Sequence, residues 1–442
     1  MMRVRFSQTW RFVAVLAACA GFARPAAATP QAGLQAAVQA ASQTLVPAGA
    51  NAAALPTQVT LADVLQLLDA RSPRTLADKA TLDVTAADRI TAGTLPNPSL
   101  SYGGTHLFQG LSTGAVTQHQ VVMEQPLLMF HQRQARGDMA DLNLRADRAR
   151  VAETLADRHR QARQAFATLL SRQQQLQVLQ ETITDLERVE QVVRGRSQAG
   201  ERSQYDLARI ETETERFRID VMNAETEVAN ASGQLASLLG FPQWQPRAIG
   251  SLDPATDVPT DADALWTVAQ AKRPSLQTLR ERQAAARGGL TLARRERLPV
   301  PAVSGGALLT NDVQGTSAFF GFSMPLLVFD KGQGPIAKAT AQVQADTLAL
   351  TAETSEARAE VERARVVLVR RREALTRLET GVVRRVPDLR RMAEANYREG
   401  TGDILELLDA MRSMRDIRIA HVQQLEMAKL AEGDVLAAVG QE

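Results

Sequence analysis

The chain repeats one architecture, and the second copy follows the first by about 200 residues. The segment Pro126-Leu127-Leu128-Met129-Phe130 returns as Pro325-Leu326-Leu327-Val328-Phe329, and Gly200 returns as Gly400. In each copy, apolar spacing predicts a helical segment, two strand-like segments, a very long helix, a turn and a returning helix. Two short strands beside such long helices do not enclose an ordinary globular core. The sequence therefore predicts a mainly α fold with a small β part, built as a tandem repeat.

The N-terminus has the pattern of an export signal over residues 1–28, with positive charge from Arg3, Arg5 and Arg11, an apolar stretch and small residues for cleavage. The only cysteine, Cys19, follows Leu-Ala-Ala, which resembles a bacterial lipoprotein cleavage box. Two outcomes stay open: lipidation at Cys19, or cleavage near Ala28. Residues 29–58 are rich in Ala, Gln and Pro and are expected to form a flexible N-terminal segment.

The first repeat is predicted over residues 59–250 and the second over residues 251–439. The 51 basic and 49 acidic residues nearly balance, which gives no support for a nucleic-acid partner. No apolar run reaches the roughly 18 residues that a membrane-spanning helix needs. Any contact with a membrane is therefore expected to come through strands.

The strand-like segments alternate between apolar and polar residues. In the second copy, Ala318, Phe320 and Phe322 alternate with Ser317, Gly321 and Ser323. Alternation over about 10 residues is typical of outer-membrane strands, although soluble hairpins have the same pattern.

The long segments lack helix-breaking residues. Residues 131–194 contain no proline and one glycine, so they predict one helix of about 96 Å. In the second copy, residues 336–386 contain a seven-residue apolar rhythm that ends at Val382. Pro387 is expected to bend this helix, and Asp403 is expected to cap the returning one.

Four strands in one chain are too few to close a barrel, and lipid does not tolerate open sheet edges. Three chains with four strands each give a 12-stranded outer-membrane β-barrel, which is wide enough to leave a lumen. The long helices would continue this barrel as an α-helical barrel. The expected assembly is a homotrimer that forms a conduit.

The sequence Tyr397-Arg398-Glu399-Gly400-Thr401-Gly402-Asp403, followed by an acidic helix, resembles the TolC-like outer-membrane factor family. The resemblance covers about residues 59–439. Pro96-Asn97-Pro98 and the stretch 200–207 look most like the branch that serves cobalt–zinc–cadmium and copper–silver exporters. The family resemblance implies an exit duct in the outer membrane of a Gram-negative bacterium. Its implied partners are a periplasmic adaptor, an inner-membrane pump of the RND type and outer-membrane lipid.

Glu406 and Asp409 lie three residues apart, so on a helix they share a face. In a trimer they would form a ring of carboxylates that attracts cations. The resemblance implies that they are the gate at the periplasmic constriction, and that Asp206 and Tyr397 form the latch that keeps it closed. The alternative is that Glu406 and Asp409 are solvated charges beside a turn.

The resemblance also implies that the helix turns at Gly200, Gly400 and Thr401 dock the adaptor. A helical reversal that needs glycine would explain the same glycines. Gly402 departs from the family pattern, which often has a basic residue there, so Arg398 or Arg202 would have to substitute in the latch.

The sequence contains no motif of an enzyme, and no cofactor is expected. The five histidines are scattered without the spacing of a metal site, so no metal is expected to be bound. Three functions stay open: an exit duct for heavy-metal cations, an exit duct for drugs or type I secreted polypeptides, and a periplasmic coiled-coil scaffold or adaptor.

Overall fold

The computed structural model describes residues 55–110, 117–198, 204–255, 258–310, 315–399 and 401–441. The predicted signal peptide, Cys19, Gly200, Arg202 and Gly400 lie outside the described residues. The described residues from Pro56 onward form one compact unit, Pro56–Glu442.

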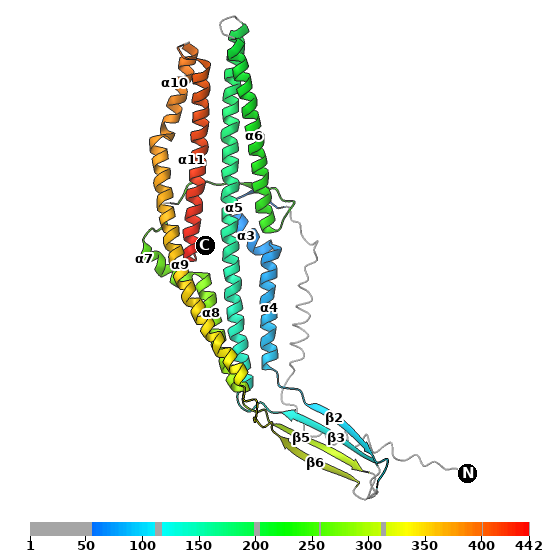
Figure 1. Cartoon of the computed structure of the whole chain (residues 1–442). Helices are drawn as coiled ribbons and strands as arrows, with labels where there is room; N and C mark the ends of the chain where they lie inside the picture. Colours follow the sequence, from blue (N-terminus) through cyan, green and yellow to red (C-terminus); the bar gives the residue numbers. More distant parts are fainter. Residues whose placement is uncertain are drawn as a thin grey trace, which may run out of the picture. The chain divides into compact units, whose positions relative to one another are not determined.

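This unit contains two sets of elements in the same order (Figure 1). The first set comprises α3 (Leu61–Arg71), α4 (Pro73–Gly93), β2 (Ser99–His106), β3 (Thr117–Pro126), α5 (Gln132–Gln198) and α6 (Gln204–Leu239). The second comprises α7 (Ala262–Lys272), α8 (Pro274–Glu296), β5 (Ala302–Thr310), β6 (Thr316–Ser323), α9 (Gln333–Gly381), the 3₁₀ turn η2 (Val383–Arg385), α10 (Val386–Glu399) and α11 (Ile404–Val439). The short strands β1 (Gln58–Val59) and β4 (Arg247–Ala248) pair in parallel.

The helix boundaries follow local signals in the sequence. Thr60 caps α3 in a reciprocal capping box with Asp63, and Pro73 is the first residue of α4. The predicted long helix is α5, which packs against α3, α4, α6, α8 and α11 and is therefore central to the unit. The interruption expected at Pro387 is also present, as α9 ends at Gly381 and α10 begins at Val386.

One detail of the predicted apolar rhythm is wrong. Val361, Leu368 and Leu375 are buried along α9, as the seven-residue spacing predicts. Val382 instead follows the last residue of α9, with φ −121°, and is 38% exposed. The helix has already ended there, so the spacing no longer determines which way the side chain points.

The four longer strands form one antiparallel sheet in the order β2-β3-β5-β6. The two strand pairs are thus joined between the repeats, through β3 and β5. Cross-strand partners share a face of a sheet, so the register assigns every strand residue to one of two faces. One face carries Leu100, Tyr102, Val121, Met123, Val303, Ala307, Leu309, Ala318, Phe320 and Phe322, with His106, Thr117, His119, Gln125 and Thr316 as its polar members. The other carries Ser99, Ser101, Gln118, Gln120, Glu124, Ser304, Ser317 and Ser323, with Val122, Leu308 and Phe319 as its larger apolar members. The sheet is therefore amphipathic.

Chain connectivity fixes which helix ends adjoin the sheet. The ends of α4 and α8 lead into strands, and the strands lead into the beginnings of α5 and α9 (Figure 1). The last residues of α5 and α10 and the first residues of α6 and α11 lie at the other end of these helices, which we call the tip. Among the described residues, no helix has enough consecutive apolar length to cross a membrane.

Candidate functional site

The tip is held together by one apolar core to which four helices contribute. Its buried members are Leu186, Val193, Ile210, Phe217, Tyr397, Ile404, Leu407, Leu408, Met411 and Met414. They come from α5, α6, α10 and α11, so both helical hairpins share this core. The hairpin α10–α11 is therefore packed against α5–α6 within the chain.

The turn between α10 and α11 is closed by backbone contacts to Asn396. The amides of Thr401 and Gly402 donate to the Asn396 carbonyl at 3.0 and 3.1 Å, and Thr401 Oγ1 donates to the same oxygen at 3.1 Å. Asp403 caps α11 as predicted, because its side chain accepts a hydrogen bond from the Glu406 amide at 2.8 Å. A Cβ atom at Gly402 would lie 2.9 Å from Glu406 Oε2, so a side chain there would require the flexible Glu406 side chain to move.

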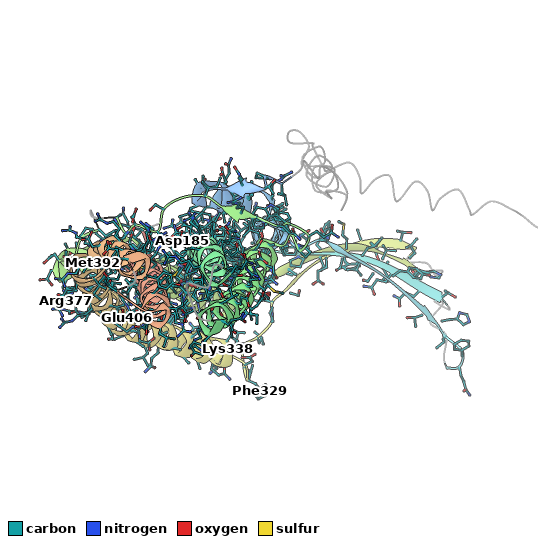
Figure 2. All side chains as sticks on the ribbon, turned by 90° about the horizontal axis from the view of Figure 1, so that it is seen from above. Asp185, Phe329, Lys338, Arg377, Met392 and Glu406 are labelled. Atoms are coloured by element: carbon teal, nitrogen blue, oxygen red, sulfur yellow. The ribbon has the colours of Figure 1, made fainter. Side chains whose placement is uncertain are left out.

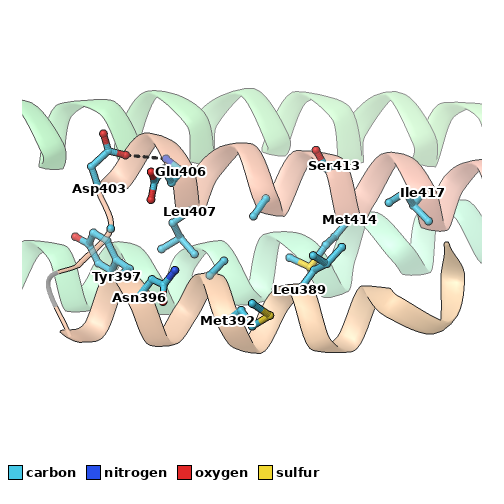
Figure 3. A pocket seen from close by; sticks show the side chains of 13 residues that line it. Leu389, Met392, Asn396, Tyr397, Asp403, Glu406, Leu407, Ser413, Met414 and Ile417 are labelled. Atoms are coloured by element: carbon cyan, nitrogen blue, oxygen red, sulfur yellow. Dashed lines mark hydrogen bonds between the residues drawn. The ribbon is translucent and has the colours of Figure 1, made fainter.

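The two predicted gate residues lie in the first turns of α11, and both are exposed. Glu406 lines a groove of about 340 Å³ between α10 and α11, together with Asp403 and apolar side chains that include Leu389, Met392 and Met414. Figure 3 shows Glu406 and Leu407 reaching from α11 toward α10, on the side where Asn396 and Tyr397 lie. Asp409 lies outside this groove, one turn further along α11.

The two predicted latch residues have different surroundings. Tyr397 is 4% exposed and belongs to the tip core, at the end of α10. Asp206 is half-buried in the first turn of α6. The Arg398 carbonyl accepts a hydrogen bond from Arg196 Nη2 at 3.3 Å, which joins the ends of α10 and α5.

Arg412 and Glu213 form the most buried ion pair of the tip, which sequence reasoning did not identify. Glu213 is 5% exposed on α6, and Arg412 of α11 donates to both of its carboxylate oxygens, at 2.7 Å from Nε to Oε1. This hydrogen bonding holds the pKa of Glu213 below its usual range and raises the pKa of Arg412. Asp409 adds to the rise in the pKa of Arg412, so one cation serves both the buried pair and a predicted gate residue.

Two further pairs continue along α11. Arg415 Nη1 lies 3.1 Å from Asp220 Oδ2 on α6, and its guanidinium lies 4.7 Å from the Phe217 ring centroid. Arg418 pairs with Glu181 of α5, and this hydrogen bond lowers the pKa of Glu181. Together with Arg412, these residues form a row at intervals of three that ties α11 to the hairpin α5–α6.

The histidines within the described residues are separated from one another. Four of them have partners: His119 with Tyr102, His106 with Thr117, His159 with Asp69, and His421 with Glu379. In the described part of the chain, no group of three or more His, Cys, Asp or Glu side chains is arranged to hold a metal ion.

Comparison with known proteins finds one matching family model and several similar structures. Residues 64–241 match the family model for "Outer membrane efflux protein". The fold is similar to the outer-membrane channel OprN, with 18% identity, a TM-score of 0.70 and coverage of 86% of this chain and 90% of OprN. It is similar to CusC, with 16% identity, a TM-score of 0.71 and coverage of 86% and 92%. It is also similar to the open state of the Neisseria gonorrhoeae outer-membrane channel MtrE, with 16% identity, a TM-score of 0.67 and coverage of 86% and 89%. A comparison with curated proteins found no match.

The fold is therefore that of the outer-membrane channels. The match to the outer membrane efflux protein model is confined to residues 64–241. The likeness to CusC is of the same size as that to OprN, so the comparisons do not select a branch of these channels.

Proposed function

We propose that the protein is a passive outer-membrane exit duct of a tripartite efflux system, working as a homotrimer. The amphipathic sheet carries this proposal. Its apolar face suits lipid and its polar face suits a water-filled lumen. Both edge strands, β2 and β6, lack an outer neighbour among the described residues of the chain.

The direction of these edges favours ring closure. Four antiparallel strands make β2 and β6 run in opposite directions, so β6 of one chain and β2 of the next would pair antiparallel. Three chains would then give the 12-stranded barrel, and the family match and the similar channel structures support that arrangement. The role is non-enzymatic.

The tip is the proposed periplasmic gate. Glu406 and Asp409 are exposed on α11 and are proposed to line the constriction, with Asp206 and Tyr397 as the latch. The turns at Gly200, Gly400 and Thr401 are proposed to dock the adaptor, which would connect the duct to an inner-membrane pump of the RND type. The buried Arg412–Glu213 pair provides the additional contact that Gly402 does not supply.

The proposed cargo is heavy-metal cations, on the strength of the sequence motifs alone. A deletion strain should become sensitive to zinc, cobalt, cadmium, nickel or copper and should regain tolerance when the gene is returned. Unchanged metal tolerance with altered drug tolerance would assign the duct to drugs instead.

Electrical recording tests the duct itself. Purified protein added to a planar lipid bilayer should give discrete conductance steps with a preference for cations over anions. A protein that leaves the bilayer insulating, and that fractionates as a water-soluble species after removal of its signal, would favour the scaffold.

A further inference from the structure

The helix ends next to the sheet carry a cluster of cations without ion-pair partners. Six exposed basic side chains lie there, and within the described residues none of them has a hydrogen-bonded or ion-paired partner for its side chain. They are Arg133, Arg294, Arg295, Arg297, Lys331 and Lys338, which we call the basic collar. Elsewhere, arginines such as Arg412 and Arg273 are held by carboxylates. Unpaired exposed arginines also occur elsewhere in the described part of the chain, for example Arg377 and Arg384, so what distinguishes the collar is its position next to the sheet.

Two of the acidic residues beside the collar have a hydrogen-bonded partner. Glu296 pairs with Arg136 at 3.0 Å, and Asp330 Oδ1 accepts a hydrogen bond from the Gly332 amide at 2.8 Å. The collar cations and Arg136 outnumber the carboxylates of Asp138, Glu296 and Asp330 in these segments, which leaves an excess of positive charge at this level of the protein.

The sequence confines this charge to one end of the sheet. No Lys or Arg occurs between Arg89 and Arg133, or between Arg297 and Lys331. Both segments that contain the strands thus lack lysine and arginine, and each segment has a basic residue at its two ends. The turns at the far end of the sheet contribute no cation.

Exposed apolar residues lie between the sheet and the collar. Leu326 is 78% exposed, Val328 61% and Phe329 92%, and in the first repeat Met129 is 62% exposed. Figure 2 shows Phe329 projecting away from the helices, near the part of α9 that carries Lys338. Along the chain, the order is thus an apolar strand, an apolar and aromatic turn, and then basic residues.

We propose that the basic collar binds the phosphate groups of anionic phospholipids in the periplasmic leaflet of the outer membrane. A bilayer presents hydrocarbon, then an interface, then charged headgroups. The apolar residues, the aromatic residue and the cations follow each other in the matching order. Long Lys and Arg side chains reach phosphates while their methylene groups stay against apolar surface. This inference rests on the proposed function, because it requires the sheet to lie in the outer membrane. If the collar binds these phosphates, the periplasmic boundary of the bilayer lies at the level of Phe329 to Lys331.

Lipid retention tests the collar with matched variants. The full-length protein would be placed in nanodiscs of phosphatidylethanolamine with a minority of phosphatidylglycerol, and the bound lipid would be measured by native mass spectrometry. Arg294→Gln/Arg295→Gln/Arg297→Gln should lower phosphatidylglycerol enrichment several-fold. The control Arg377→Gln/Arg384→Gln/Arg385→Gln removes three exposed cations from the end of α9 and from η2, and should leave the enrichment unchanged.

Three results would overturn the inference. The first is equal enrichment in the collar variant and the wild type. The second is full displacement of phosphatidylglycerol by millimolar inorganic phosphate, which would make the collar a site for free anions. The third is a changed oligomeric mass with unchanged lipid, which would assign the collar to contacts between copies of the chain.

Depth measurement separates this inference from the proposed function. Phe320→Trp in β6 and Phe329→Trp would be compared for quenching by lipids brominated along the acyl chain, with the wild-type tryptophan signal subtracted. The collar model expects strong quenching at residue 320 and quenching confined to shallow bromines at residue 329. Quenching at residue 320 alone would overturn the boundary and leave the duct intact. Absence of quenching at both positions would overturn the duct as well.

Discussion

Arg412 of α11 and Glu213 of α6 form a two-point ion pair that joins the second helical hairpin of the tip to the first. Glu213 is 5% exposed, and Arg412 is the main cation that lowers its pKa, with smaller contributions from Arg216 and Arg209. The proposed gate residue Asp409 lies one turn from Arg412 on the same helix. The position of the gate helix therefore depends on a contact formed within a single chain.

Removal of Arg412 should loosen the beginning of α11. Arg412→Ala leaves a buried carboxylate without its donor, which costs about 1–3 kcal/mol. Amide hydrogen exchange over Ile404–Arg415 should speed up roughly tenfold, since about 1.4 kcal/mol corresponds to a factor of ten. The double variant Arg412→Ala/Glu213→Ala should recover part of the protection because the buried charge is then absent.

Arg365→Ala is the matched control for this experiment. Arg365 pairs with Glu362 one turn away on the same helix, at the surface. Its loss should leave exchange in α11 unchanged. Equal exchange in wild type and Arg412→Ala would show that the apolar core alone positions α11.

Acidification should weaken the ion pairs Arg412–Glu213 and Arg418–Glu181, which tie α11 to α6 and α5. The pKa of Glu213 is lowered mainly by the hydrogen bond from Arg412, and that of Glu181 mainly by the hydrogen bond from Arg418. A lowered folded pKa means that this stability is fully present above the unfolded value of about 4.3 and is lost as pH falls through the folded value. Thermal stability should therefore be flat near neutral pH and decline in acid. Glu213→Gln should reduce the decline, and a wild-type slope in this variant would remove Glu213 from the acid response.

Neutralisation of the proposed gate should change ion selectivity. Glu406→Gln/Asp409→Asn keeps the size of both side chains and removes two charges per chain, so reversal potentials under a salt gradient should shift toward zero. Asp83→Asn is the control, because Asp83 is an exposed carboxylate on α4, far along the helices from the tip. Unaltered selectivity in the double variant would place both residues outside the constriction.

The residue before α5 adopts a conformation that favours glycine. His131 has φ 62°, and Gly332, at the same place before α9, has φ 72°. Just inside each helix, a glutamine accepts a hydrogen bond from the backbone, Gln132 at 2.8 Å and Gln333 at 2.7 Å. His131→Gly should therefore raise stability by about 0.5–1 kcal/mol by relieving the left-handed strain. Gly332→Ala should lower it, since a Cβ there would also lie 3.0 Å from Arg297 Cγ. A lower melting temperature for His131→Gly would contradict this account.

Much of the fold was predictable because its signals are local. Pro73 begins α4, Asp403 caps α11, and the alternation around Phe320 matches the register of the sheet. The end of α9 before Val382 was less predictable, because apolar spacing does not show where a helix stops.

The contacts of the tip were beyond sequence reasoning for a physical reason. Arg412 and Glu213 are 199 residues apart, and the chain contains many arginines and glutamates with similar spacing. Only the packing of α6 against α11 selects this pair. The groove beside Glu406 likewise depends on how α10 lies along α11, which local pattern does not encode.

The central claim is that three chains complete one pore wall by pairing strand β6 of each with β2 of the next. The most direct test is the mass of the particle extracted from outer membranes, measured in nanodiscs by native mass spectrometry and combined with hydrogen exchange of the edge strands. We expect a particle of three chains in which the amides of β2 and β6 are as protected from exchange as those of β3 and β5. A monomer with fast exchange in both edge strands would contradict it.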